Sequence, residues 1–317
     1  MRFRTVRTLI AVALAAAPIM ATGDAGAQET LRTRNVVLVT IDGLRWQELF
    51  SGADPALIRD RRYTPDTAEA LARFWRPQAI ERRSTLMPFV WSTLASQGQL
   101  FGDRTAGSYV EITNRHRFSY PGYNEILTGF ADPRINSNNK TPNPNRTVLE
   151  VINDHPSFKG KVAVFGSWDV FPFIVNEARS GIPVNAGYER ATGRIGEREA
   201  FLNELQSQTP VLWSSVRLDA FTHQFALEYM RRERPRLIHI AYGEADDFAH
   251  DGRFDHYLDA VQRTDGFLRE LWTFLQDQAA YRGTTTMLVV GDHGRGSGEQ
   301  FSTAAQRVNQ IPIAAAC

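Results

Sequence analysis

The sequence predicts an α/β protein with a doubly wound, mostly parallel sheet and helices on both faces. Short runs rich in valine and isoleucine, typical of buried strands, occupy residues 35–40, 161–168, 236–242 and 284–291. Between them lie stretches with the apolar spacing of helices, most clearly residues 254–278. Because that helical stretch joins the third and fourth runs, it predicts a strand–helix–strand unit of a parallel sheet.

The remaining segments fill in one domain with inserted loops. Residues 67–75 and 89–98 have helical patterns, and residues 108–113 have the pattern of a strand. Residues 131–146 are rich in asparagine and proline, which predicts a surface loop bordering a site. With 317 residues, 43% of them hydrophobic, the chain can bury a full core, and no linker marks a domain boundary.

The first 27 residues have the three-part pattern of a secretory signal peptide. Three arginines precede the apolar run 9–20, and small residues at 25–27 offer a cleavage site. The alternative is an uncleaved anchor, although this run is short for a membrane span. We therefore expect a mature chain, residues 28–317, that is periplasmic or secreted and has no membrane partner once the signal is removed.

Charge and cysteine content exclude some classes of protein. Removing residues 1–27, with three arginines and one aspartate, changes the formal net charge from +1 to −1. A near-neutral protein lacks the basic surface on which non-specific nucleic-acid binding depends, so no nucleic-acid partner is expected. The only cysteine is Cys317, which excludes an internal disulfide.

Acidic and histidine residues follow three of the four predicted strands. They are Asp42 after the first, Asp246 and His250 after the third, and Asp292 and His293 after the fourth. A single aspartate is common in turns, and a single histidine is more often hydrogen-bonded than bound to a metal. The carboxyl ends of parallel strands share one edge, however, and several carboxylates buried together need a cation. A metal site at this edge is therefore predicted.

Residue types and spacing refine this prediction. Asp246 and His250 lie four residues apart, on one face of a helical turn, and a mixed aspartate and histidine set suits zinc better than magnesium or calcium. Glu244 and Asp247 are the next candidates as ligands. The pair 255–256 (Asp-His) opens a predicted helix, where the helix dipole favours an acidic residue, and we expect no metal there.

Ser119 is the candidate nucleophile. It comes directly before a turn and an apolar helical segment that ends at Gly129, which places its hydroxyl at a helix N-terminus. Serine is also a favoured helix cap, and this alternative remains open at this point. A hydroxyl directed at a metal cluster can be ionised by it and attack phosphorus.

These stretches together resemble the alkaline phosphatase superfamily, in particular its nucleotide pyrophosphatase/phosphodiesterase-like and bacterial secreted branches. The matching segments are VVLVTIDGLRW, FSYPGYNEILTG, YGEADDFAH and GDHGRG, in the family's order over residues 35–296. The resemblance implies an alkaline-phosphatase-like fold and two divalent metal ions, for which zinc is expected.

Roles follow from the resemblance position by position. Asp42, Asp292 and His293 look like ligands of the first metal, with Ser119 at the family's Thr or Ser nucleophile, which also contacts that metal. Asp246 and His250 fall on the pair that holds the second metal. Asn138 or Asn139 is the counterpart of an asparagine that steadies the transferred group.

One departure from the family stands at the C-terminal end. The family's second metal takes a further histidine, but residues 295–317 contain none. The resemblance then implies either that the sequence is truncated or altered there, or that the second metal binds poorly and activity is reduced or lost.

The expected function is a secreted, metal-dependent hydrolase of small-molecule phosphate mono- or diesters, acting through a seryl-phosphate intermediate. The alternatives are a sulfatase-like or mutase-like member of the superfamily, or a catalytically impaired metal-binding homologue. The segment at Ser119 lacks the arginine of the sulfatase pattern, and it lacks the glycines of a serine-hydrolase elbow.

Overall fold

The structure, a computed structural model, describes residues 32–302 and 313–316. The expected signal peptide, residues 1–27, and Cys317 lie outside the described residues. In the part described, no helix combines the length and the apolar character that crossing a membrane requires.

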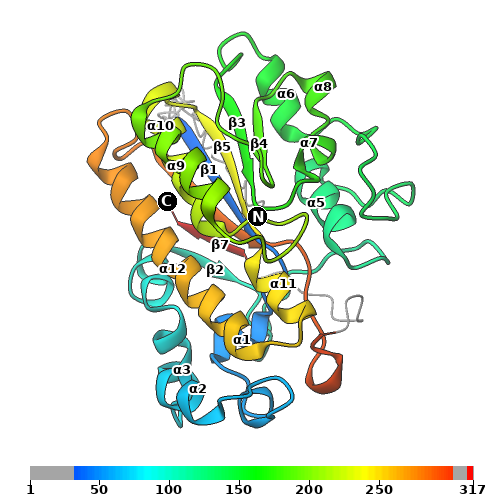
Figure 1. Cartoon of the computed structure of the whole chain (residues 1–317), viewed down its shortest axis with the longest axis vertical. Coiled ribbons are helices and arrows are strands. Elements are labelled where there is room, and N and C mark those ends of the chain that lie inside the picture. Colours follow the sequence, from blue (N-terminus) through cyan, green and yellow to red (C-terminus); the bar gives the residue numbers. More distant parts are fainter. Residues whose placement is uncertain (1–31, 303–312, 317) are drawn as a thin grey trace, which may run out of the picture. The chain divides into compact units, whose positions relative to one another are not determined.

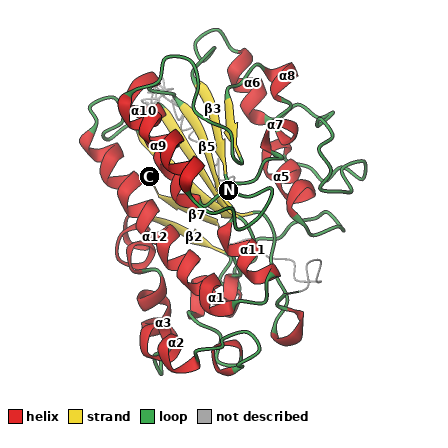
Figure 2. Cartoon of the chain, in the orientation of Figure 1, coloured by secondary structure: helices red, strands yellow, loops and turns green. Residues whose placement is uncertain are grey.

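One sheet forms the centre of the protein (Figures 1 and 2). Its order is β2-β7-β6-β1-β5-β3-β4, and the strands β6, β1, β5, β3 and β4 run parallel, whereas β7 is antiparallel to β6 and to β2. The described strands are β1 (Asn35–Ile41), β2 (Gly98–Phe101), β3 (Val162–Gly166), β4 (Val184–Ala186), β5 (Leu237–Tyr242), β6 (Thr285–Gly291) and β7 (Ile313–Ala316).

Helices cover both faces of this sheet, which confirms the predicted fold class. In Figure 1, α9, α10 and α12 lie along one side of the strands and α5 to α8 along the other. The α-helices are α1 (Trp46–Ser51), α2 (Thr67–Phe74), α3 (Ala79–Leu86), α4 (Ala95–Gln97), α5 (Ser119–Thr128), α6 (Val148–Asp154), α7 (Phe171–Ile174), α8 (Glu177–Ser180), α9 (Glu197–Gln208), α10 (Asp219–Glu233), α11 (Glu244–His250) and α12 (Phe254–Asp277). Short helices of other types are η1 (Leu57–Arg59), η2 (Val90–Leu94, a π-helix), η3 (Arg104–Ala106) and η4 (Gly298–Gln300).

The alternation of side chains along β1 explains why both faces are apolar. Val37, Val39 and Ile41 pack into the core shared with α10 and α12, whereas Val36 and Leu38 pack against the core shared with α5, α6 and α7. Side chains of a strand point alternately to opposite faces, so a strand with apolar residues at successive positions, as at 36–39, must lie between two layers.

Most of the elements expected from periodicity are present, with one exception. The four predicted strands correspond to β1, β3, β5 and β6, and the helical patterns to α2, α12 and the η2–α4 segment. The strand predicted at 108–113 is wrong, because these residues form no ladder. Instead, the Glu125 carboxylate accepts hydrogen bonds from the backbone amides of Thr113 and Asn114, at 2.7 and 3.0 Å.

Candidate metal and nucleophile site

The site lies at the carboxyl ends of three adjacent parallel strands. In the register of β1, Ile41 pairs with Gly291 of β6 on one side and with Tyr242 of β5 on the other. The next residues along the chain are therefore brought to the same edge of the sheet. This register places Asp42 beside Asp292 and puts the α11 segment next to both.

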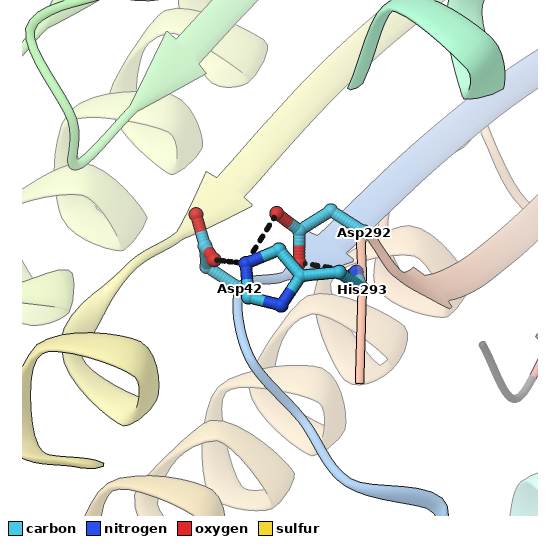
Figure 3. Close-up of side chains that lie close together, drawn as sticks. All are labelled: Asp42, Asp292 and His293. Atoms are coloured by element: carbon cyan, nitrogen blue, oxygen red, sulfur yellow. Dashed lines mark hydrogen bonds and ion pairs between the residues drawn. The ribbon is translucent and has the colours of Figure 1, made fainter. Parts of the chain in front are cut away.

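Asp42, Asp292 and His293 form a compact, buried cluster (Figure 3). One ligand atom from each residue lies within 4.8 Å of the other two. The His293 Nε2 atom is 3.3 Å from Asp42 Oδ1 and 3.5 Å from Asp292 Oδ2. Three side chains of types that can bind a metal ion thus converge on one point.

Hydrogen bonds orient the ligand atoms of this cluster. Asp292 Oδ1 accepts from the amides of Gly43 and His293, at 3.1 and 2.8 Å, whereas its buried Oδ2 has no hydrogen-bond partner. His293 Nδ1 donates to the Gly294 carbonyl at 3.0 Å, so in the neutral ring Nε2 carries the lone pair that faces the carboxylates. The Tyr123 hydroxyl donates to Asp42 Oδ2 at 3.2 Å.

The electrostatics of the cluster favour a bound cation. Burial, and then the charge of Asp42, raise the pKa of Asp292 well above its ordinary value. Burial alone would lower the pKa of His293, but Asp292 and the neighbouring carboxylates raise it to about 10. The metal-free site therefore gathers protons to offset negative charge, which a divalent ion does directly. Two carboxylates and an imidazole, with one carboxylate oxygen that has no hydrogen-bond partner, form a site that fits a zinc-type ion.

Ser119 faces this cluster and does not cap its helix. It is the first residue of α5, and the cap position is Phe118, which makes no side-chain cap bond. Its Oγ lies 3.4 Å from Asp42 Oδ1 and 3.3 Å from His293 Nε2. Gly122 permits this approach, because a Cβ there would lie 2.4 Å from the Asp292 carbonyl oxygen.

Asp246 and His250 lie next to the cluster but outside its group of three ligand atoms. Asp246 Oδ1 is 3.9 Å from His293 Nε2, and its Oδ2 is 3.0 Å from His250 Nε2. The Arg295 guanidinium is in contact with the other oxygen, Oδ1. Although burial alone would raise the pKa of Asp246, Arg295 holds it below its usual range.

A pocket of about 160 Å³ opens in front of these residues. It contains Asn138, whose Oδ1 accepts from the Tyr120 amide at 3.0 Å, but not Asn139. Of the two next candidates as ligands, Asp247 lines the pocket, whereas Glu244 is buried away from it against Arg263 and the Asp219 amide. Burial, and then Asp246, raise the pKa of Asp247 to about 9.

Sequence reasoning missed two aromatic residues of the pocket wall and the arginine behind it. Phe118 and Trp168 line the pocket. Trp168 follows β3, so it could have been predicted from the tendency of ligands to bind at the carboxyl ends of parallel strands. Arg295 stands in the GDHGRG segment but its contact with Asp246 has no sequence signal. A larger cavity of about 410 Å³ near β4, α9 and α10 contains none of the site residues.

The chain is similar in fold to several solved structures. A phosphonoacetate hydrolase from Sinorhizobium meliloti is 17% identical, with a TM-score of 0.46, covering 84% of this chain and 58% of that one. A protein in the alkaline phosphatase superfamily from Vibrio parahaemolyticus is 14% identical, with a TM-score of 0.49 and coverages of 89% and 60%. The zinc complex of the C-terminal periplasmic domain of EcEptC from Escherichia coli is 8% identical, with a TM-score of 0.48 and coverages of 90% and 73%.

The chain spans about 60% of the length of the first two of these proteins. No curated protein matches its sequence. A family model, described as type I phosphodiesterase / nucleotide pyrophosphatase, matches residues 51–311, which is most of the chain and confirms the resemblance seen in the sequence. The chain belongs to the type I phosphodiesterase / nucleotide pyrophosphatase family.

Proposed function

We propose that the protein is a metal-dependent hydrolase of small phosphate mono- or diesters and that Ser119 is its nucleophile. The observation that carries this proposal is the position of Ser119 Oγ, 3.4 Å from Asp42 Oδ1 and 3.3 Å from His293 Nε2. Membership of a phosphodiesterase family supports the reaction class. The hydroxyl, the metal-binding cluster and the pocket meet at one place.

Asp42, Asp292 and His293 would hold a divalent ion, for which we propose zinc. When bound, the ion supplies positive charge that favours an ionised serine oxygen and a bound phosphate. The second ion, on Asp246 and His250, was expected from the family resemblance.

The protein's own groups account for orientation of the nucleophile. Ser119 donates to Asp42 Oδ1, which directs its oxygen toward the pocket, and Asn138 joins the pocket wall to the first turn of α5. In the first step the serine oxygen bonds to phosphorus as the ester oxygen leaves with a proton. In the second, water cleaves the seryl phosphate and regenerates the hydroxyl.

We also propose that residues 1–27 are a secretory signal and that the mature protein is periplasmic or secreted. The support is the arginine, apolar and small-residue pattern of that segment. Cell fractionation and N-terminal sequencing test this proposal. Mature protein that begins near residue 28 outside the cytoplasm is expected, and full-length protein in the cytoplasm would contradict it.

The test of the reaction uses aryl phosphate monoesters, aryl phosphate diesters and aryl sulfates as substrates. We expect zinc-dependent release of the aryl alcohol from a phosphate ester, its loss on chelation, and its restoration by zinc. Ser119→Ala should keep bound metal but lose turnover by at least ~1,000-fold, because only the attacking oxygen is removed. Unchanged turnover would contradict the role of Ser119, and turnover of sulfates alone would contradict the substrate class.

A further inference from the structure

A fixed cation stands where the second metal ion was expected. The Arg295 side chain is 1% exposed, and its Nη1 pairs with Asp246 Oδ1. Its Nε donates to the Phe301 carbonyl at 3.1 Å and its Nη2 to the Ser302 carbonyl at 3.5 Å. The guanidinium is therefore held on three sides, and only one of its contacts is to the site.

Core packing determines where this guanidinium lies. Phe301 is completely buried, and its ring packs edge-on against Tyr63, Phe254 and Tyr257, with centroids 5.2 to 6.0 Å apart. Because the Phe301 carbonyl binds Arg295, the aromatic cluster fixes the arginine relative to the sheet. Displacing the guanidinium from Asp246 would leave a buried charge without its partner, which is costly.

Both oxygens of Asp246 already have partners. Oδ1 contacts Arg295, and Oδ2 lies 3.0 Å from His250 Nε2. The carboxylate is also pressed against Gly43, where a Cβ would lie only 2.3 Å from Oδ1. Asp246 therefore has its negative charge matched by Arg295. By contrast, Asp292 Oδ2 in the neighbouring cluster has no hydrogen-bond partner.

We propose that Arg295 replaces the second cation, so that the site binds one divalent ion, on Asp42, Asp292 and His293. In this arrangement Arg295 is a positioning residue that acts through Asp246, since it does not line the pocket. The inference rests on the proposed metal-dependent function, but it changes the number of ions. A second ion beside Asp246 would be repelled by the positive charge of Arg295, which contacts to the Phe301 and Ser302 carbonyls hold in place.

The test measures the number of zinc ions per chain by inductively coupled plasma mass spectrometry, after the protein has been saturated with zinc and the excess removed. Wild-type protein should hold about one ion, and Asp246→Asn should keep it, whereas Asp42→Ala should lose it. Arg295→Met should raise the count toward two, because it frees the Asp246 carboxylate, and Arg295→Lys should return it to one. A purely structural role of Arg295 does not predict a gained ion.

Arg263→Met is the matched control. It removes a guanidinium from Glu244, another buried carboxylate of α11, 2.8 Å away, which does not face the pocket. Its zinc count should stay at one.

The outcomes separate the two proposals. Two ions in wild-type protein overturn this inference and leave the metal-dependent hydrolase standing, whereas no ion refutes both. A folded Arg295→Met variant that still holds one ion also overturns the inference. If that variant does not fold, the numbers of zinc ions in wild-type protein and in Asp246→Asn test the inference. Loss of the ion from Asp246→Asn would contradict the inference.

Discussion

Replacing Asp292 by asparagine should stabilise the metal-free protein while weakening metal binding. Asp292 Oδ1 accepts two backbone hydrogen bonds, which the asparagine oxygen can keep. The substitution changes only Oδ2, which has no hydrogen-bond partner and lies 3.5 Å from His293 Nε2, into an amide nitrogen near Asp42. The shape of the site is thus retained while one buried negative charge is removed.

The separation of the ligand atoms sets the size of the effect. The ligand atoms of Asp42, Asp292 and His293 lie within 4.8 Å of one another. At that separation and an effective dielectric constant of about 20, two like unit charges repel by about 3 kcal/mol. A protonated His293 offsets part of this repulsion, so we expect a gain of about 1–3 kcal/mol in the free energy of unfolding without metal.

Urea unfolding with a chelator present, and again with saturating zinc, measures both consequences. Asp292→Asn should unfold at higher urea than wild type in the chelator and gain less from zinc, because the stabilisation by a ligand follows its affinity. Zinc affinity by competition with a chromophoric chelator should fall at least ~100-fold. A variant that is less stable in chelator would refute the charge argument, and unchanged zinc affinity would remove Asp292 from the metal site.

Three further predictions test residues that pack against the site or lie in the strand next to it. Gly43→Ala should abolish hydrolysis, because Gly43 has a φ of 65° and a Cβ there would lie 2.3 Å from Asp246 Oδ1. The control is Gly107→Ala, where φ is 74° but a Cβ would meet no other atom. It should cost about 1 kcal/mol in the free energy of unfolding and leave activity unchanged. Tyr123→Phe removes a hydrogen bond to the carboxylate of Asp42, a proposed metal ligand, and should weaken zinc binding about 10-fold in the same competition assay; equal affinity would exclude a role of Tyr123 in orienting Asp42. Burial lowers the pKa of His239 from 6.5 to about 3, so below pH 6.5 the unfolded chain binds a proton that the folded chain does not, and stability falls as the pH drops. Between pH 7 and pH 5 this should cost about 2 kcal/mol by urea unfolding, and His239→Gln should lose less stability over that range than wild type; the same loss in both would contradict the assignment.

The central strands were predictable because they are buried on both faces. Residues 35–40 and 284–291 contain the apolar runs 36–39 and 287–290, and β1 and β6 occupy nearly the predicted bounds. The edge strands β2 and β4 have only four and three residues, too few to show a period. Residues 108–113 looked like a strand, but the amides of Thr113 at its end and of the next residue, Asn114, bind the side chain of Glu125, a contact that no local pattern encodes.

The same limit applies within the site. The convergence of Asp42, Asp292 and Asp246 followed from strand ends, because parallel strands share their carboxyl edge. The choice between Asn138 and Asn139 depends on how a loop folds, and only Asn138 reaches the pocket. The pairing of Arg295 with Asp246 depends on the burial of Phe301, which is a property of the packed core.

Anomalous X-ray diffraction at the zinc absorption edge tests the central claim most directly. From zinc-saturated crystals we expect one strong peak per chain, about 2.0–2.2 Å from a carboxylate oxygen of Asp42, a carboxylate oxygen of Asp292 and Nε2 of His293. The Ser119 oxygen should face the same peak. A map without a peak among these three residues would contradict the metal site, and with it the proposed role of Ser119.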